Sequence, residues 1–231
     1  MSFIVKNTSF PGLLDLLAPH SCRGCGHLGK PLCDCCKNYI ISHHVNICPN
    51  CKKLNHNGKC HKCKSLPPTF IVDERSELIG KLIHDFKYDS VRSLAQPLAE
   101  ILDSILPTIS GEVFIVPLPT IGRHVRERGL DHTLLIAKRL AKLRGRYYRV
   151  SKALLRSQNS IQVGSNRAQR LSQAQTAYTI KKDTALSPNA TYILLDDVWT
   201  TGASIQAATK ILRQAGAKNI IICLLALSRL N

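Results

Sequence analysis

YILLDDVWTTGAS, residues 192–204, is the stretch that decides the fold of this chain. It begins as a short apolar run, continues with Asp196 and Asp197, and passes through a loop of hydroxyl side chains and one glycine into a helical pattern. This order predicts a buried strand followed by a helix, with two carboxylates and a short loop between them. Ligands of open α/β sheets bind at the carboxyl ends of the strands, so these residues are the first candidates for a functional site.

The loop in this stretch has the composition of a phosphate-binding site. Backbone N–H groups at a helix start lack intrahelical partners and attract anions, and Gly202 lets a ligand approach the backbone closely. Two adjacent carboxylates repel each other, which costs free energy unless something positive binds there. We therefore expect Asp196 and Asp197 to accept hydrogen bonds from ribose hydroxyls or to contact Mg²⁺ through water. The alternative is a plain strand–turn–helix in which a hydroxyl caps the helix and the acids form salt bridges. The candidate phosphate-binding residues are Thr200, Thr201, Gly202, Ala203 and Ser204.

From about residue 69 onward the chain alternates between apolar runs and amphipathic segments. Such alternation predicts an α/β fold with a mostly parallel sheet that helices cover on both faces. We expect strands over 69–72, 113–116, 147–150, 193–195 and 220–226, and helices over 76–88, 91–106, 132–144 and 204–215. Pro67-Pro68 marks the border between this domain, residues 67–231, and a first domain, residues 1–66, that includes a short N-terminal lead.

The first domain is dominated by cysteine. Nine of the ten cysteines lie between residues 22 and 63, and eight of them form four C-x₂-C pairs. Two such pairs supply the four thiolates of a tetrahedral zinc site, so the segment predicts two zinc ions. Four thiolates per ion leave no open coordination position, which indicates a structural role in which metal supplies the folding energy. The predicted ligands are Cys22, Cys25, Cys33, Cys36, Cys48, Cys51, Cys60 and Cys63.

The pairing of these ligands is left open by the sequence. Sequential pairing, which joins the first pair with the second and the third with the fourth, is the natural arrangement, and a cross-braced pairing is the alternative. Cys35 could replace Cys36, whereas His27 and His61 are less favoured ligands. A disulfide framework would need an oxidising compartment. The sequence shows neither a signal peptide nor an apolar segment long enough to span a membrane, so we expect a cytoplasmic protein with reduced cysteines.

The charge balance is strongly basic. There are 32 Lys and Arg against 15 Asp and Glu, a formal net charge of +17. Such a charge predicts attraction to nucleic acid, to polyphosphate ligands or to an acidic membrane face, and the alternative is a generic basic surface. The excess gathers in two segments: residues 22–64 hold eight basic residues and one acid, and residues 144–182 hold nine basic residues and no acid.

Several motifs together resemble the ComF family of phosphoribosyltransferase-like competence proteins. The 192–204 stretch is similar to the loop that binds phosphoribosyl pyrophosphate (PRPP) in type I phosphoribosyltransferases, and the cysteine pairs are similar to the family's N-terminal zinc module. The remaining matches are 86–88 (FKY), 116–119 (VPLP), Arg123, Arg126, 128–132 (RGLDH), 155–156 (LR) and 162–178 with Gln162, Arg167 and Arg170. Leu130, Asp131 and His132 depart from the aromatic residue, Asn and Gln that are usual in the family.

The resemblance implies a type I phosphoribosyltransferase-like domain that binds PRPP together with Mg²⁺. Asp196 and Asp197 would hold the ribose, the 200–204 loop would hold the 5′-phosphate, and Lys87 and Arg128 would complete the ligand site. Residues 144–182 would form a mobile loop over it. The implied function is the handling of incoming single-stranded DNA in natural transformation, in the cytoplasm or at the inner face of the membrane beside the DNA-uptake machinery. The alternative is an active Mg²⁺-dependent phosphoribosyltransferase, for which no residue set identifies the acceptor. A sequence-specific DNA-binding regulator is a weaker alternative, because no recognition helix of helix-turn-helix type is visible.

Overall fold

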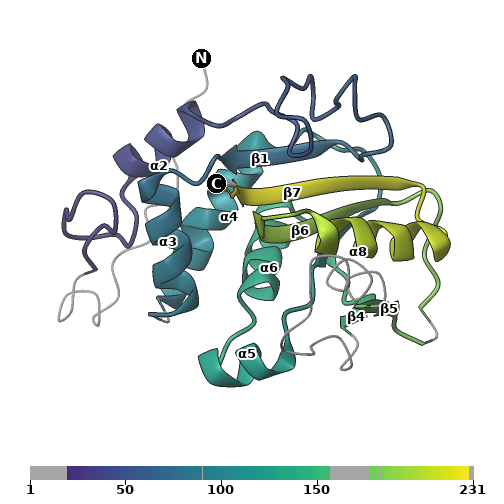
Figure 1. Ribbon diagram of the computed structural model, residues 1–231. Helices are drawn as coiled ribbons and strands as arrows, with labels where there is room; N and C mark the ends of the chain where they lie inside the picture. The colour runs from purple at the N-terminus through teal and green to yellow at the C-terminus, as the bar shows by residue number, and fades with distance from the viewer. Residues whose placement is uncertain (1–19, 90, 157–176, 183, 229–231) are drawn as a thin grey trace, which may run out of the picture.

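A parallel sheet forms the centre of the molecule. The computed structural model describes residues 20–89, 91–156, 177–182 and 184–228. Five parallel strands lie in the order β1–β7–β6–β2–β3, of which Figure 1 labels β1, β7 and β6, and a separate antiparallel pair is formed by β4 and β5. The strands are β1 (Thr69–Asp73), β2 (Val113–Pro117), β3 (Tyr148–Val150), β4 (Leu154–Arg156), β5 (Tyr178–Ile180), β6 (Thr191–Trp199) and β7 (Asn219–Leu227).

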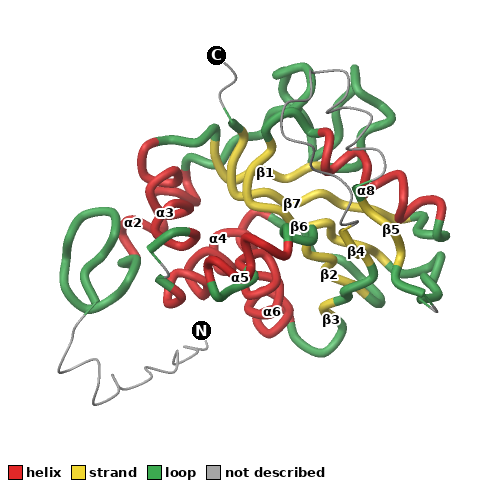
Figure 2. Tube along the Cα trace, turned by 60° about the horizontal axis from the view of Figure 1, so that its bottom comes forward, coloured by secondary structure: helices red, strands yellow, loops and turns green. Residues whose placement is uncertain are grey.

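Helices cover both faces of the sheet (Figure 2). One face is packed by α3 (Glu77–Lys87), α4 (Ala95–Ile105) and α6 (His132–Arg144), and α5 (Gly122–Arg128) precedes α6 in the chain. The other face is packed by α8 (Ala203–Gln214) and the β4–β5 pair. Side chains of β6 alternate between the two cores: Ile193 faces the first group of helices, and Leu194 faces α8. A strand buried on both faces reads as a continuous apolar run, which is the pattern that opened the sequence analysis.

The predicted α/β architecture is confirmed, with three differences. The strand predicted over 193–195 extends to Trp199, so the two acids lie within β6 rather than after it. The sequence analysis missed α2 (Asp34–Ser42) of the cysteine-rich segment, α5, which is short and basic, and the three-residue strands β4 and β5. Elements this short carry too few residues to show a hydrophobic period. The predicted helix over 91–106 is divided into a 3₁₀ turn, η1 (Arg92–Leu94), and α4.

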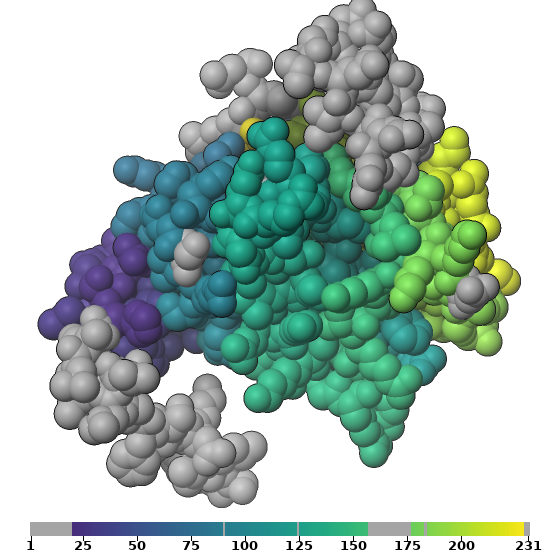
Figure 3. Space-filling view, turned by 90° about the horizontal axis from the view of Figure 1, so that it is seen from below, coloured from purple at the N-terminus to yellow at the C-terminus, as the bar shows by residue number. Residues whose placement is uncertain are grey.

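The cysteine-rich segment wraps around the edge of the sheet at β1. Its first half contains α2 (Asp34–Ser42) and contributes Cys22, Leu32 and Ile40 to the core under α3 and α4. Val45 then bridges to Ile71 of β1, and the second half packs on the α8 side. In the view from below, the first half (purple) and the C-terminal elements (yellow) lie at opposite edges of the molecule (Figure 3). The segment therefore covers an open sheet edge and reaches both faces.

No helix in the described part of the chain is long and apolar enough to cross a membrane.

Candidate functional site

The two acids lie where β6 extends beyond the end of its neighbour β2. The last paired residues of these strands are Leu195 and Pro117, and beyond them the N–H of Leu118 donates to the carbonyl of Leu195 at 2.8 Å. The chain then leaves the sheet toward α5, while β6 continues beside β7 through Asp196. This divergence opens a crevice at the carboxyl end of the sheet, which is the position that ligands take in open α/β folds.

A cavity of about 200 Å³ occupies this crevice. It collects side chains from α3, the β2–α5 connection, the ends of α5 and α6, the β4–β5 pair, β6 and the start of α8. Its lining residues are Lys87, Leu118, Pro119, Thr120, Ile121, Arg128, His132, Thr133, Arg156, Tyr178, Asp196, Asp197 and Ser204. Three permanent cations therefore face two carboxylates, which gives the cavity an excess of positive charge suited to an anionic ligand.

The two carboxylates have different environments. Asp197 forms an ion pair with Lys87, and the side chains of both are only about one-fifth exposed. The carboxylate of Asp196 accepts a hydrogen bond from the backbone N–H of Asp197 at 2.9 Å. Burial, and then the charge of Asp197, raise the pKa of Asp196 well above its usual value. A ligand that brings positive charge or hydroxyl donors to Asp196 would relieve this cost.

Two arginines of the cavity are held by tyrosines. The guanidinium of Arg128 stacks 4.7 Å from the ring centre of Tyr88 and donates to its hydroxyl at 3.4 Å. Arg156 of β4 donates to the hydroxyl of Tyr178 in β5 at 3.1 Å, and its Nε is buried without a hydrogen-bond partner among the described residues. Both guanidinium groups are thus oriented by the protein and keep donors free for an anion.

His132 also lines the cavity. It is the first residue of α6, is only 3% exposed, and packs edge-on against Phe86 with 4.9 Å between ring centres. Neither ring nitrogen has a hydrogen-bond partner among the described residues. Burial, and then the positive charge of Arg128, lower the pKa of His132, which favours a neutral imidazole that can both donate and accept.

The structure brings together most of the predicted site residues. Asp196, Asp197, Lys87, Arg128 and Ser204 all line the cavity. The sequence analysis did not assign a site role to three further lining residues, His132, Arg156 and Tyr178. All three residues stood in segments that resemble the family, and the β4–β5 pair brings Arg156 and Tyr178 together at the cavity.

The rest of the predicted loop follows the cavity without lining it. Thr200, Thr201, Gly202 and Ala203 connect β6 to α8, and Gly202 caps α8 with φ +77° and ψ −4°. The predicted loop over 144–182 is wrong in part, because its described ends contain β3, β4 and β5, and backbone pairing holds these residues as strands. Its middle, residues 157–176, lies outside the described residues.

The predicted metal ligands form two groups, and each group could hold a zinc ion. Cys22, Cys25, Cys33 and Cys36 gather in one, and Cys48, Cys51, Cys60 and Cys63 in the other, with all sulfur atoms of a group within 4.8 Å of one another. The structure therefore brings the pairs together sequentially rather than in the cross-braced arrangement. Cys35, His27 and His61 belong to neither group.

The geometry of both groups fits tetrahedral zinc. Sulfur atoms lie 3.6 Å apart between Cys25 and Cys33 and 3.5 Å apart between Cys51 and Cys60, near the roughly 3.8 Å that four Zn–S bonds of about 2.3 Å require. The Sγ of Cys22 accepts backbone N–H groups of Gly24 at 3.4 Å and of Cys33 at 3.3 Å. Burial alone would raise the pKa of Cys22, but these donors outweigh it and lower the pKa to about 6. A side chain at Gly24 would meet the Sγ of Cys36 at 2.7 Å, so the turn is shaped around the sulfur cluster.

Comparison with known proteins agrees with this geometry. Residues 134–229 match the model of the phosphoribosyl transferase domain. The chain is also 25% identical over 195 residues to the competence protein ComFC of Streptococcus pneumoniae, and this match covers 82% of the chain and 84% of the relative. The resemblance to the ComF family is confirmed. The crevice at β6 and the two sulfur clusters agree with what this resemblance implies, a cysteine-rich N-terminal segment followed by a phosphoribosyltransferase-like domain.

Proposed function

We propose that this ComF-family chain binds Mg²⁺-PRPP, or a closely similar phosphoribosyl ligand, in the cavity at the end of β6 and handles single-stranded DNA during natural transformation. The observation that carries the proposal is the pair of adjacent carboxylates, one held by Lys87, in a cavity whose remaining permanent charges are arginines. A ribose that carries phosphates at both ends presents hydroxyl donors to the carboxylates and anionic oxygens to the arginines.

Each part of the ligand has a candidate partner. Asp196 and Asp197 would accept the ribose hydroxyls or coordinate Mg²⁺ through water. The start of α8, from Thr200 to Ser204, would receive the 5′-phosphate on backbone N–H groups and hydroxyls. Arg128 and Arg156 face the same cavity and would neutralise the pyrophosphate, and Lys87 fixes Asp197.

The nucleic-acid part of the proposal is supported by charge and by similarity. The formal net charge is +17, and the relative with which the chain aligns over 82% of its length is named as a competence protein. A protein that accompanies incoming DNA would act in the cytoplasm or at the inner face of the membrane, beside the uptake machinery.

Two zinc ions would be structural, because four thiolates saturate each of them.

The second candidate function is an active phosphoribosyltransferase, which is favoured by the three cations around the two acids. In that reaction the bond between C1 of the ribose and the pyrophosphate breaks, pyrophosphate leaves with the electron pair, and an acceptor forms the new bond at C1 and loses a proton. The cations would stabilise the charge that develops on the leaving group.

Calorimetric titration of the zinc-loaded protein with Mg²⁺-PRPP tests the proposal. We expect micromolar binding that is lost in Asp196→Asn/Asp197→Asn and kept in Glu112→Gln, a carboxylate remote from the cavity whose only described partner is Arg149. Absence of binding by the wild type would refute the ligand assignment. Pyrophosphate release that requires a defined acceptor would favour the transferase, and binding without turnover would favour the handling function.

A further inference from the structure

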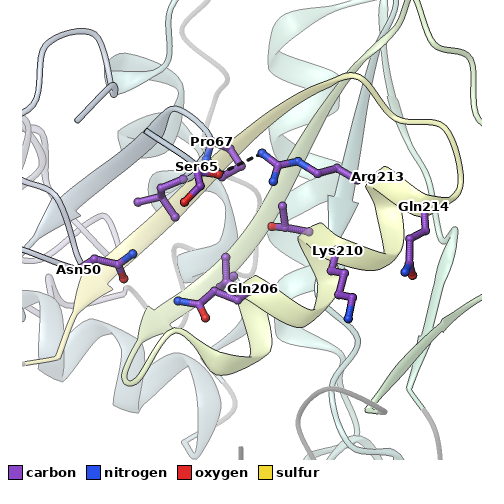
Figure 4. A pocket seen from close by; sticks show the side chains of 10 residues that line it. Asn50, Ser65, Pro67, Gln206, Lys210, Arg213 and Gln214 are labelled. Atoms are coloured by element: carbon purple, nitrogen blue, oxygen red, sulfur yellow. Dashed lines mark hydrogen bonds between the residues drawn. The ribbon is translucent and has the colours of Figure 1, made fainter. Parts of the chain in front are cut away.

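A second hollow runs along α8, between this helix and the cysteine-rich segment (Figure 4), and reaches the amino ends of β6 and β7. Two cavities, of about 400 and 680 Å³, share Leu66, Pro67 and Arg213 and therefore form one continuous surface, called here the α8 groove. One wall comes from the segment around Asn50 and Ser65, and the other from α8. The nitrogen Nη2 of Arg213 donates to the carbonyl of Ser65 at 3.2 Å and so ties the walls together.

The α8 groove concentrates positive charge. Of the described residues that line it, five are permanent cations and none is Asp or Glu. None of the five forms an ion pair with a carboxylate of the described residues. The five are Lys59, Lys64, Lys210, Arg213 and Lys218. The whole chain has about one acidic residue for every two basic residues. A surface with five cations and no acidic residue therefore has a more positive electrostatic potential than the average surface, and this potential attracts anions.

The groove also contains uncharged polar side chains and apolar surface. Thr209 of α8 lines it with only 5% of its surface exposed, and its hydroxyl has no hydrogen-bond partner among the described residues. Amide side chains of Asn50, Gln206 and Gln214 stand beside the apolar surface of Leu66 and Ile205. Cations, amides and apolar contacts together match a chain that offers phosphates and uncovered bases.

We infer that the α8 groove is the surface on which this protein binds single-stranded DNA, with the five cations on the phosphodiester backbone and the amides on base edges. A duplex would present phosphates but would hide most base surface from the amides and the apolar residues. The inference rests on the nucleic-acid part of the proposed function and gives it a location.

The end of the α8 groove near Thr191 is well separated from the phosphoribosyl cavity. Thr191, at the start of β6, lines the groove, and Asp197, six residues along the same strand, lines the cavity. Six residues of extended strand span about 20 Å. DNA at that end of the groove would therefore not compete with PRPP for space, whereas at the other end Ile205 of the groove directly follows Ser204 of the cavity.

A charge-matched pair of variants tests the assignment. Lys210→Gln/Lys218→Gln removes two cations from the groove, and Lys138→Gln/Lys142→Gln removes two from the exposed side of α6, outside both cavities. The four lysines are all exposed and unpaired by any described carboxylate, so each variant changes net charge equally without breaking an ion pair. Fluorescence anisotropy with a labelled 20-nucleotide oligo-dT is the readout.

The expected result follows from counterion release. Five phosphate contacts on a single strand give a slope of log K against log salt of about −3.5, a loss of roughly 130-fold in affinity between 50 and 200 mM salt. The groove variant should show a slope of about −2.1, a loss of roughly 20-fold over the same range, and about tenfold weaker binding near 150 mM. The α6 variant should keep the wild-type slope, and both variants should keep Mg²⁺-PRPP binding.

The outcomes separate two kinds of failure. If the wild type does not bind oligo-dT, the nucleic-acid part of the proposed function fails together with the inference. If the wild type binds but both double variants weaken equally, or neither does, the groove assignment is wrong and the proposed function stands. Equal affinity for a duplex of the same length would overturn the assignment to a single strand.

Discussion

Substituting Gly202 by alanine should destabilise the protein far more than an ordinary glycine substitution. Gly202 has φ +77° and ψ −4°, in the left-handed region, and caps α8 directly after the strand that carries the two acids. A Cβ at this position would lie 2.2 and 2.5 Å from two carbons of the Trp199 indole. Trp199 is only 2% exposed, so its ring cannot turn away into solvent.

The cost has two parts. The left-handed backbone costs an alanine about 1–2 kcal/mol. The Cβ needs about 3.4 Å from a ring carbon, so the loop or the indole must shift by roughly 1 Å, and overpacking of this kind costs about 1–3 kcal/mol. Together we expect a loss of roughly 2–5 kcal/mol from a free energy of unfolding that is typically about 5–15 kcal/mol.

Gly129→Ala provides the matched control. Gly129 is also left-handed, with φ +64° and ψ +13°, but the nearest atom to an added Cβ there is a terminal nitrogen of Arg92 at 3.8 Å. This variant should therefore lose only the backbone cost, and the difference between the two variants isolates the contact with Trp199. Urea unfolding followed by fluorescence measures both, because Trp199 is the single tryptophan of the chain.

Equal unfolding free energies for the two alanine variants would refute the reasoning, since they would mean that the indole is not packed against the loop. A red-shifted native emission for the wild type would contradict the burial of Trp199. If Gly202→Ala is less stable by the expected margin, the glycine is required by tertiary packing of the loop as well as by the close approach of a phosphate.

Three further predictions address the acids and the metal. Because the pKa of Asp196 is raised, its ionisation in the folded state costs stability as pH rises, so Asp196→Asn should raise the melting temperature by an amount that grows between pH 5 and pH 8, and a constant difference would contradict it. Lys87→Met leaves Asp197 charged and largely buried and should cost about 1–3 kcal/mol, most of which the further change Asp197→Asn should restore in thermal unfolding. The wild type should contain two zinc ions by elemental analysis, and Cys22→Ser or Cys48→Ser should each leave one, whereas loss of both ions from either variant would contradict two independent clusters.

The sequence predicted the long elements well and the site incompletely. Strands such as β7 and helices such as α8 carry enough residues for their apolar period to show, and they were placed to within a few residues. The acids were identified, but the extension of β6 past them was not, because pairing with β7 continues after β2 has left. The residue at which β6 ends is set by its pairing with β7, and no pattern in the local sequence marks it.

Two features of the site depend on tertiary structure alone. His132 reads as an ordinary polar residue at a helix start, and only the packing of Phe86 and the approach of Arg128 make it a buried and unpartnered cavity residue. The sequential grouping of the cysteines is likewise set by how the segment turns around β1, because the C-x₂-C spacing is the same in both pairings.

The two sulfur clusters stand beside different functional regions, so they are not interchangeable. The first cluster holds Arg23, whose carbonyl accepts from Lys81 at 2.7 Å and whose guanidinium lies 3.7 Å from the buried Asp85; both partners belong to α3, the helix that carries Lys87 into the phosphoribosyl cavity. The second cluster includes Cys60, which itself lines the α8 groove.

A metal ion in each cluster would therefore support one binding region more than the other. Loss of the first would release α3 and loosen the ion pair at Asp197, whereas loss of the second would spread the cations of the groove wall. On this reasoning the cysteine-rich segment is more than a covering for the sheet edge at β1. It braces the cavity from one face of the sheet and forms a wall of the groove on the other, and a chain that handles DNA and a phosphoribosyl ligand together would need both.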